Sequence, residues 1–180
     1  MSFEEVMEAL KAAGTEQNRK IYPRHGVKNE LYGVSFADLG NYVITDYFAD
    51  NVFQTPQARQ KMEAWTQADD EWLGQAGWRL VAKFALQDPT LPDPYFVSHL
   101  VQIEREIHAR KNRVRDAMNS ALIAIGVRNA MLQEEALEAA GKIGKVAVDH
   151  GQTSCKTPDA AGHILKTVKH REEKRVVSQI

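Results

Sequence analysis

A carboxylate lies in the middle of a largely apolar stretch of this chain, YVITDYFADNVF at residues 42–53. Asp46 lies in its middle, among aromatic and aliphatic side chains. A carboxylate in such surroundings finds a partner, becomes neutral or meets a positive charge. An aspartate within a helix more often faces solvent or bonds the end of a neighbouring helix. Asp46 is therefore a candidate for chemistry that needs a fixed anion, with a plain surface or capping role as the alternative.

The densest run of positive charge is REIHARKNRVRD, at residues 105–116. Apolar residues interleave with the basic ones, so the basic side chains can share an outward face. Such a strip grips nucleic-acid phosphates without reading sequence, whereas a solvated corner between two helices is the commoner explanation of a charge run. The basic residues are Arg105, His108, Arg110, Lys111, Arg113 and Arg115. Arg79, Lys83 and Arg128 extend the strip if the helices stack in chain order.

Three tryptophans, Trp65, Trp72 and Trp78, lie close together in the chain. Exposed indole rings stack on nucleic-acid bases. Buried ones fill the interface between helices, which is the commoner role. The sequence favours the second role for these three residues.

Residues of the types that bind zinc cluster in VDHGQTSCKTPDAAGH, at residues 148–163. Asp149, His150, Cys155 and His163 lack any recognised ligand spacing, so a structural role is favoured over a metal site. The chain also has no P-loop, no glycine-rich dinucleotide fingerprint and no Ser-His-Asp order. We expect neither a metal nor a cofactor.

Length and composition limit the remaining function classes. A chain of 180 residues suits one domain, which we expect to span residues 1–180. The net charge of −1 gives no global case for nucleic-acid binding, which must rest on local clustering. The single cysteine, Cys155, excludes an intramolecular disulfide and suits a reducing compartment. No signal peptide or membrane span is recognisable, so we expect a cytoplasmic protein without a membrane partner.

Apolar residues at helical spacing, together with capping residues, predict a chain of successive helices. Pairs of these helices span roughly 40 residues, the spacing of HEAT-type repeats. The expected fold is all-α, a right-handed solenoid of antiparallel HEAT-like helical repeats, with a compact helical bundle as the alternative. The helices are predicted to begin near Ser2, Ser35, Tyr42, Thr55, Asp69, Pro94, Asn112, Ala130 and Thr157, and Thr55, Asp69 and Asn112 are predicted N-caps. The helix that begins near Ala130 is predicted to end at about Ile143, and the segment GKVAVDHG that follows is too short to found a sheet.

Five segments, in the same order, resemble the DNA alkylation repair proteins of the AlkD-like class, which are built from HEAT-like repeats. They are ELYGVSFADL, YVITD, WLGQAGWRLVAKFAL, RVRDAMNSALIAIGVRN and VDHGQTSCKTPDAAGHI, and together they cover most of the chain. The resemblance implies an all-helical solenoid whose basic concave face cradles duplex DNA. It also implies a DNA glycosylase that excises cationic N3- or N7-alkylated purines from duplex DNA.

The same resemblance assigns catalytic roles to Asp46 and Tyr42, because the family has an aromatic residue four positions before an aspartate. This spacing places both on one helix face. Breaking the bond between sugar and alkylated base leaves positive charge on the deoxyribose, which a nearby carboxylate stabilises strongly in a water-poor site. The anion can also position the attacking water, and the aromatic face adds about 0.5–2 kcal/mol. Contacts to DNA phosphates are expected from Arg79, Lys83, Arg110, Lys111, Arg113 and Arg115.

The chain departs from the family pattern at three places. An arginine expected just after the tryptophan–leucine pair is replaced by Gly74 and Gln75, with Arg79 about one turn further on as a stand-in. A second aromatic wall is replaced by Ser120. A non-catalytic module that binds DNA or a protein, and a purely structural solenoid, are therefore alternatives to the glycosylase. The passage from SFADLG into NYVITD is shorter than the family pattern, which predicts an internal deletion near residues 40–41.

Overall fold

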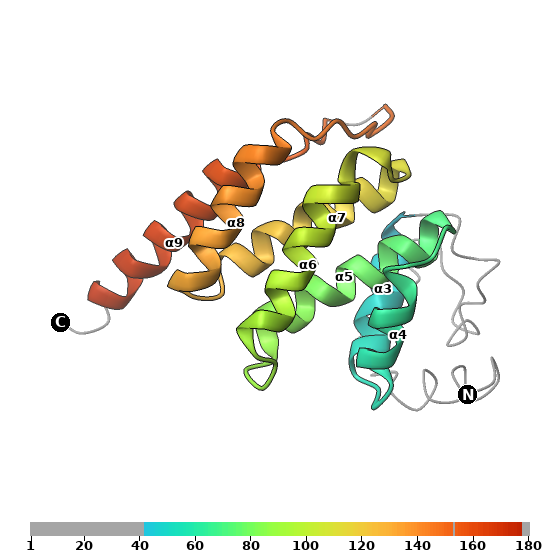
Figure 1. Cartoon of the computed structure of the whole chain (residues 1–180), viewed down its shortest axis with the longest axis horizontal. Coiled ribbons are helices and arrows are strands. Elements are labelled where there is room, and N and C mark those ends of the chain that lie inside the picture. Colours follow the sequence, from blue (N-terminus) through green and yellow to red (C-terminus); the bar gives the residue numbers. More distant parts are fainter. Residues whose placement is uncertain (1–41, 153, 178–180) are drawn as a thin grey trace. The chain divides into compact units, whose positions relative to one another are not determined.

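A computed structural model describes residues 42–152 and 154–177, and every regular element within these two ranges is helical (Figure 1). The helices expected near Ser2 and Ser35, and the junction expected near residues 40–41, lie outside the described residues. The chain divides into two compact units between Leu80 and Val81, inside one long helix.

The described part of the first unit contains helix α3 (Tyr42–Phe53), helix α4 (Ala58–Trp65) and the first part of helix α5 (Glu71–Gln87). α3 packs against α4, and the rings of Phe48 and Trp65 stack with their centroids 5.5 Å apart. Trp78, in α5, is fully buried. Trp65 and Trp78 therefore pack inside the protein, as the sequence predicts, and are not available to stack on nucleic-acid bases.

The second unit contains the rest of α5, α6 (Asp93–Glu106), the 3-10 helix η3 (Ile107–Ala109), α7 (Asn112–Gly126), α8 (Ala130–Ile143) and α9 (Ala160–Val177). α8 packs against α6, α7 and α9 and lies beside α9 in Figure 1. Gly126 allows Ile164 of α9 to approach α7, because a Cβ at Gly126 would lie 2.6 Å from the Ile164 Cδ1. The largest fully buried side chains of this unit are Phe96, Ile103, Ile107, Met118, Leu122, Ile125, Leu132 and Ile164.

Two helices of the first unit begin later than the sequence predicts. α4 begins at Ala58, because the Thr55 hydroxyl donates to the Val52 carbonyl at the end of α3 and does not cap α4. α5 is capped by Asp70, whose Oδ1 accepts two main-chain N–H groups of the first turn. The prediction that Asp69 caps α5 was wrong by one residue, because both aspartates satisfy the same preference for an N-cap.

The predicted bounds of α8, from Ala130 to Ile143, are confirmed, but the caps of α7 and α9 differ from those predicted. Asn112 does not cap α7, since its amide pairs with the main chain of Asp149. α9 begins at Ala160 and not near Thr157, and Asp159 accepts the Gly162 N–H at its first turn. The Thr157 hydroxyl bonds His150 instead.

The described residues between α8 and α9 form no strand or helix, in agreement with the prediction that GKVAVDHG is too short to found a sheet. Gly144 and Gly151 have positive φ angles of 67° and 64°, a backbone conformation that glycine adopts without strain. None of the helices described here has the length and hydropathy that crossing a membrane requires.

Close packing between α4 and α5 depends on Gly77. A Cβ at this position would lie 2.5 Å from the Thr66 main-chain nitrogen and 2.6 Å from the Trp65 main-chain carbon. Because a backbone yields less easily than a side chain, we expect Gly77→Ala to lower the free energy of unfolding by about 1–3 kcal/mol, measured by urea denaturation.

Gly141→Ala in α8 is the matched control, because nothing lies within 4 Å of a Cβ at this position. Alanine is a better helix former than glycine, so this change should raise the free energy of unfolding by about 0.5–1 kcal/mol. Changes of the same sign at both glycines would contradict the close approach at Gly77.

Candidate active site and nucleic-acid interface

The carboxylate of Asp46, which lies in a largely apolar stretch, is hydrogen-bonded to two polar side chains of α5. Its Oδ1 accepts hydrogen bonds from Gln75 Nε2 at 2.7 Å and from Arg79 Nε at 2.8 Å. No hydrogen bond from the described part of the chain ends on Oδ2, and the side chain is 39% exposed. One oxygen of this carboxylate is thus held in place, while the other makes no hydrogen bond with the described residues.

Gln75 ties α3 to α5 as well as orienting Asp46. Its Nε2 also donates to the main-chain oxygen of Tyr42, at 3.0 Å. Both partners are acceptors, so the amide nitrogen must be the atom that faces them. The residue is 1% exposed, and its Oε1 is buried with no donor among the described residues. Gln75 therefore serves to position Asp46.

Arg79 lies one turn beyond Gln75 on α5, so the two side chains share a helix face. The sequence predicts Arg79 both as a phosphate contact and as a stand-in for the missing arginine. The structure places its guanidinium in an ion pair with Asp46, at 2.8 Å. Tyr42, one turn before Asp46 on α3, is among the exposed large side chains. Asp46, Gln75, Arg79 and Tyr42 are together called the Asp46 site.

From the sequence alone, Gln75 was identified only as a residue that stands where the family pattern has an arginine. The signal that could have identified it is its spacing of four from Arg79, which puts an amide and a guanidinium on the same helix face. Among the described residues no group of three or more His, Cys, Asp or Glu side chains could hold a metal ion.

The basic run of the second unit is partly neutralised by Glu106. Arg105 and Arg110 both pair with this carboxylate, Arg110 at 3.8 Å. Burial raises the pKa of Glu106, but hydrogen bonds from Arg105 and Gln102 and the charge of Arg110 outweigh burial and leave the pKa below its ordinary value. Glu106 is thus an anion that competes with any phosphate for these two arginines.

The other residues of the second unit that are predicted to contact phosphate differ in how exposed they are. Lys111 is exposed at the N-cap of α7, and Arg113 is half-buried in the first turn. Lys83 is half-buried on α5. Arg115 is half-buried and lines a cavity beneath the segment between α8 and α9. Lys111 is therefore the most accessible of these four cations.

A family model for the DNA alkylation repair enzymes matches residues 36–164, which include the Asp46 site and the basic run. The chain belongs to this family of DNA alkylation repair enzymes. This finding confirms the resemblance on which the sequence predictions rest.

Curated relatives of this family member include two uncharacterized proteins of Listeria. The protein of Listeria innocua is 30% identical over 138 residues, and that of Listeria monocytogenes is 33% identical over 138 residues. Each match covers 76% of this chain and 58% of the relative. The chain therefore spans about three fifths of the length of these relatives.

A solved structure has a similar fold, with a TM-score of 0.68 and 21% sequence identity over 94% of this chain and 95% of that chain. It is described as representing a new family of proteins related to the HEAT-like repeat DNA glycosylases, with affinity for branched DNA structures. The fold class of this family member is accordingly all-α with HEAT-like helical repeats, as predicted.

Ser120, which stands where the resemblance implies an aromatic wall, is half-buried on α7. Its hydroxyl donates to the main-chain oxygen of Asp116, at 3.0 Å, one turn earlier in the same helix. A hydroxyl bonded in this way offers no flat surface to a base, so any aromatic contact must come from another residue.

Proposed function

We propose that this member of the DNA alkylation repair enzyme family is a DNA glycosylase that excises cationic N3- or N7-alkylated purines from duplex DNA. The observation that carries the proposal is the half-engaged carboxylate of Asp46. Gln75 and Arg79 hold its Oδ1, and its Oδ2 makes no hydrogen bond within the described part of the chain.

The proposed reaction requires few protein groups besides the Asp46 carboxylate. An alkylated purine that carries positive charge is a good leaving group, so no strong general acid is needed. As the glycosidic bond breaks, positive charge moves to the deoxyribose, and the free oxygen of Asp46 stabilises it. The same oxygen can orient the water that attacks the sugar carbon. Gln75 and Arg79 limit rotation of the carboxylate and so reduce the reorganisation required during the reaction.

The direct test is a base-release assay on duplex DNA treated with a methylating agent. We expect 7-methylguanine and 3-methyladenine to appear faster with the protein than with buffer alone. Release at the spontaneous rate, from a preparation that binds the same duplex, would contradict the proposal.

A second candidate function is DNA binding without base excision. It is favoured by the absence of the expected arginine at Gln75 and of an aromatic residue at Ser120. The similar solved structure, described as having affinity for branched DNA structures, supports it as well. Binding of branched or duplex DNA that weakens with salt, without base release, would distinguish this function from the glycosylase.

Both candidate functions require contacts to DNA phosphates, for which Lys111 and Arg113 are the proposed residues. We expect Lys111→Ala and Arg113→Ala each to reduce the slope of log affinity against log salt concentration by about 1. Fluorescence anisotropy with a labelled duplex, across a salt series, measures this slope.

Lys142→Ala is the control for this experiment. Lys142 lies on α8 and is held by Glu104 and Glu138, so its replacement should leave the slope unchanged. If the Lys111 and Arg113 variants kept the slope of the unmodified protein, these two residues would not contact phosphate.

A further inference from the structure

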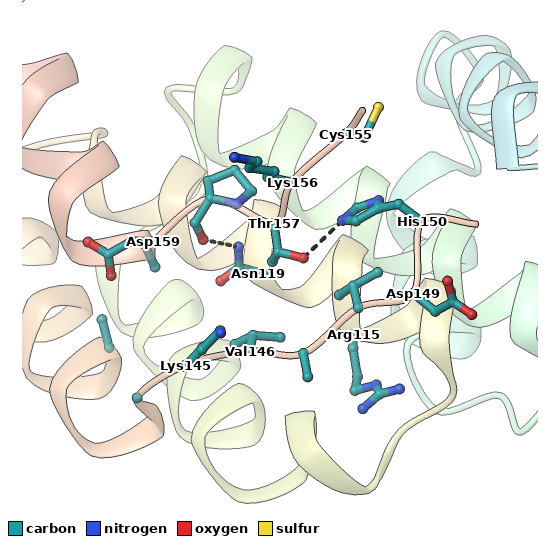
Figure 2. Close-up of a pocket in the computed structure, with 16 residues that line it drawn as sticks. Arg115, Asn119, Lys145, Val146, Asp149, His150, Cys155, Lys156, Thr157 and Asp159 are labelled. Carbon is teal, nitrogen blue, oxygen red and sulfur yellow. Dashed lines mark hydrogen bonds between the residues drawn. The ribbon is translucent and has the colours of Figure 1, made fainter. Parts of the chain in front are cut away.

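The irregular segment between α8 and α9 is held over α7 by side chains of that helix (Figure 2). Asn112 makes two hydrogen bonds of 2.7 Å with the main chain of Asp149. Asn119, two turns further along α7, donates to the Pro158 carbonyl at 3.0 Å. His150 and Thr157 bond each other across the segment, at 2.9 Å. The segment therefore has two arms, residues 145–149 and 156–159, and side-chain hydrogen bonds hold both arms in position.

A cavity of about 940 Å³ lies between this segment and α7, and all of it belongs to the second unit. Its volume is within the range of roughly 300–1,000 Å³ that small-molecule sites occupy. Lys145 comes from the first arm and Lys156 from the second, with Asn119 between the arms in Figure 2. Arg115 lines the cavity below the first arm. Apolar walls come from Ala140, Val146, Val148, Pro158 and Ala160.

The cavity lining has a small excess of positive charge, because Arg115, Lys145 and Lys156 outnumber Asp149 and Asp159. Both of its carboxylates are engaged with main-chain N–H groups, Asp149 with Gly151 and Asp159 with Gly162. Within the described part of the chain, Lys145 and Lys156 form no ion pair. Paired cations elsewhere in the unit, such as Lys142, have carboxylates in reach. An anion that entered the cavity would therefore meet two lysines that form no ion pair with the described residues.

Two polar atoms at the cavity wall have no partner among the described residues. Asn119 is 1% exposed, and its Oδ1 is buried without a donor. The orientation of this amide is fixed, because its nitrogen donates to the Pro158 carbonyl, which can only accept. The Nε of Arg115 is likewise buried without an acceptor. A buried acceptor without a donor is costly, and a ligand with an N–H group would remove that cost.

We propose that this cavity binds a single nucleotide. Its phosphate lies between Lys145 and Lys156, its base packs against the apolar wall, and an N–H group of the base donates to Asn119 Oδ1. Since Oδ1 is buried, this last contact requires a small shift of the atoms that cover it. The cavity shares no residue with the Asp46 site, and this proposal adds to the proposed function without depending on it.

Two kinds of ligand have the required phosphate next to a polar ring. One is a free deoxynucleoside monophosphate, and the other is the terminal nucleotide of a DNA strand that carries a 5′-phosphate.

Calorimetric titration with the four deoxynucleoside monophosphates tests the proposal. We expect binding to the full chain that weakens at least about tenfold in the Lys145→Gln/Lys156→Gln double variant, because two charged contacts are lost. The matched control, Lys142→Gln/Lys169→Gln, removes two exposed lysines of the same unit outside the cavity and should bind as the unmodified chain does. No binding by the unmodified chain, or equal weakening in both double variants, would overturn the proposal.

Two further measurements complete the test. Nucleotide binding should shift the NMR signals of the Asn119 side-chain amide, and an unshifted amide would overturn the assigned contact. Inorganic phosphate should bind more weakly than any nucleotide, and equal affinity would reduce the site to one for phosphate alone. Displacement of the nucleotide by a 5′-phosphorylated oligonucleotide, but not by its 5′-hydroxyl counterpart, identifies a strand end as the source, and displacement by neither identifies a free nucleotide. Asp46→Asn should leave nucleotide binding intact, so this proposal and the glycosylase proposal fail separately.

Discussion

Asp46→Asn is expected to slow the release of 7-methylguanine from methylated duplex DNA by about a hundredfold to a thousandfold. The substitution keeps an oxygen that can accept from Gln75 and Arg79, so the link between α3 and α5 is retained. It removes the negative charge that would face the sugar as the base departs. The loss should therefore appear in single-turnover release rates, while affinity for the duplex stays the same.

Glu63→Gln is the matched control for this experiment. Glu63 belongs to the same unit, is half exposed and pairs across one helical turn with Arg59. Its neutralisation removes the same charge from the first unit without touching the Asp46 site. Release that is unchanged in the Asp46 variant, or equally slowed in both variants, would exclude Asp46 from the reaction.

The helices were largely predictable because they depend on local signals. The apolar periodicity and the flanking residues of α8 predict Ala130–Ile143, and the structure has these bounds. Capping residues were less predictable, since Asp69 and Asp70 have the same chemical preference and only the path of the chain chooses between them. Asn112 does not cap its helix because its side chain bonds the main chain of Asp149, 37 positions away, and no local sequence pattern reveals this contact.

The candidate site, like the helices, was only partly predictable from the sequence. The spacing of Tyr42 and Asp46 on one helix face is visible in the sequence. The bond between Asp46 and Arg79 joins residues 33 positions apart, and only the packing of α3 on α5 brings them together. In the basic run the number of charges was evident, but their pairing with Glu106 depends on rotamers and burial. A charge count therefore overestimates the cations that are available to a phosphate.

Arg128→Met is expected to lower the free energy of unfolding by roughly 3–5 kcal/mol, the largest stability effect we predict for this chain. The sequence suggested Arg128 as an extension of the phosphate-binding strip, but the structure turns it inward, with a side chain only 13% exposed. Its guanidinium donates to the main-chain oxygens of Ala85, at 2.8 Å, and Leu91, at 3.0 Å. It also lies 4.7 Å from the ring centroid of Phe96.

Methionine occupies a similar volume, so the cost of Arg128→Met arises from groups that lose their partner. These groups are the carbonyl of Ala85 at the end of α5, the carbonyl of Leu91 in the loop after it, and the carboxylate of Asp93. Urea denaturation followed by circular dichroism measures this cost. Arg59→Met is the control, because Arg59 is exposed and its pair with Glu63 contributes less than about 1 kcal/mol. Arg128→Lys should fall between the two, since an ammonium keeps the charge but cannot bridge two carbonyls with the fork of a guanidinium. An Arg128→Met variant as stable as the Arg59 control would mean that water satisfies these carbonyls, and Arg128 would then again be a candidate for contacting phosphate.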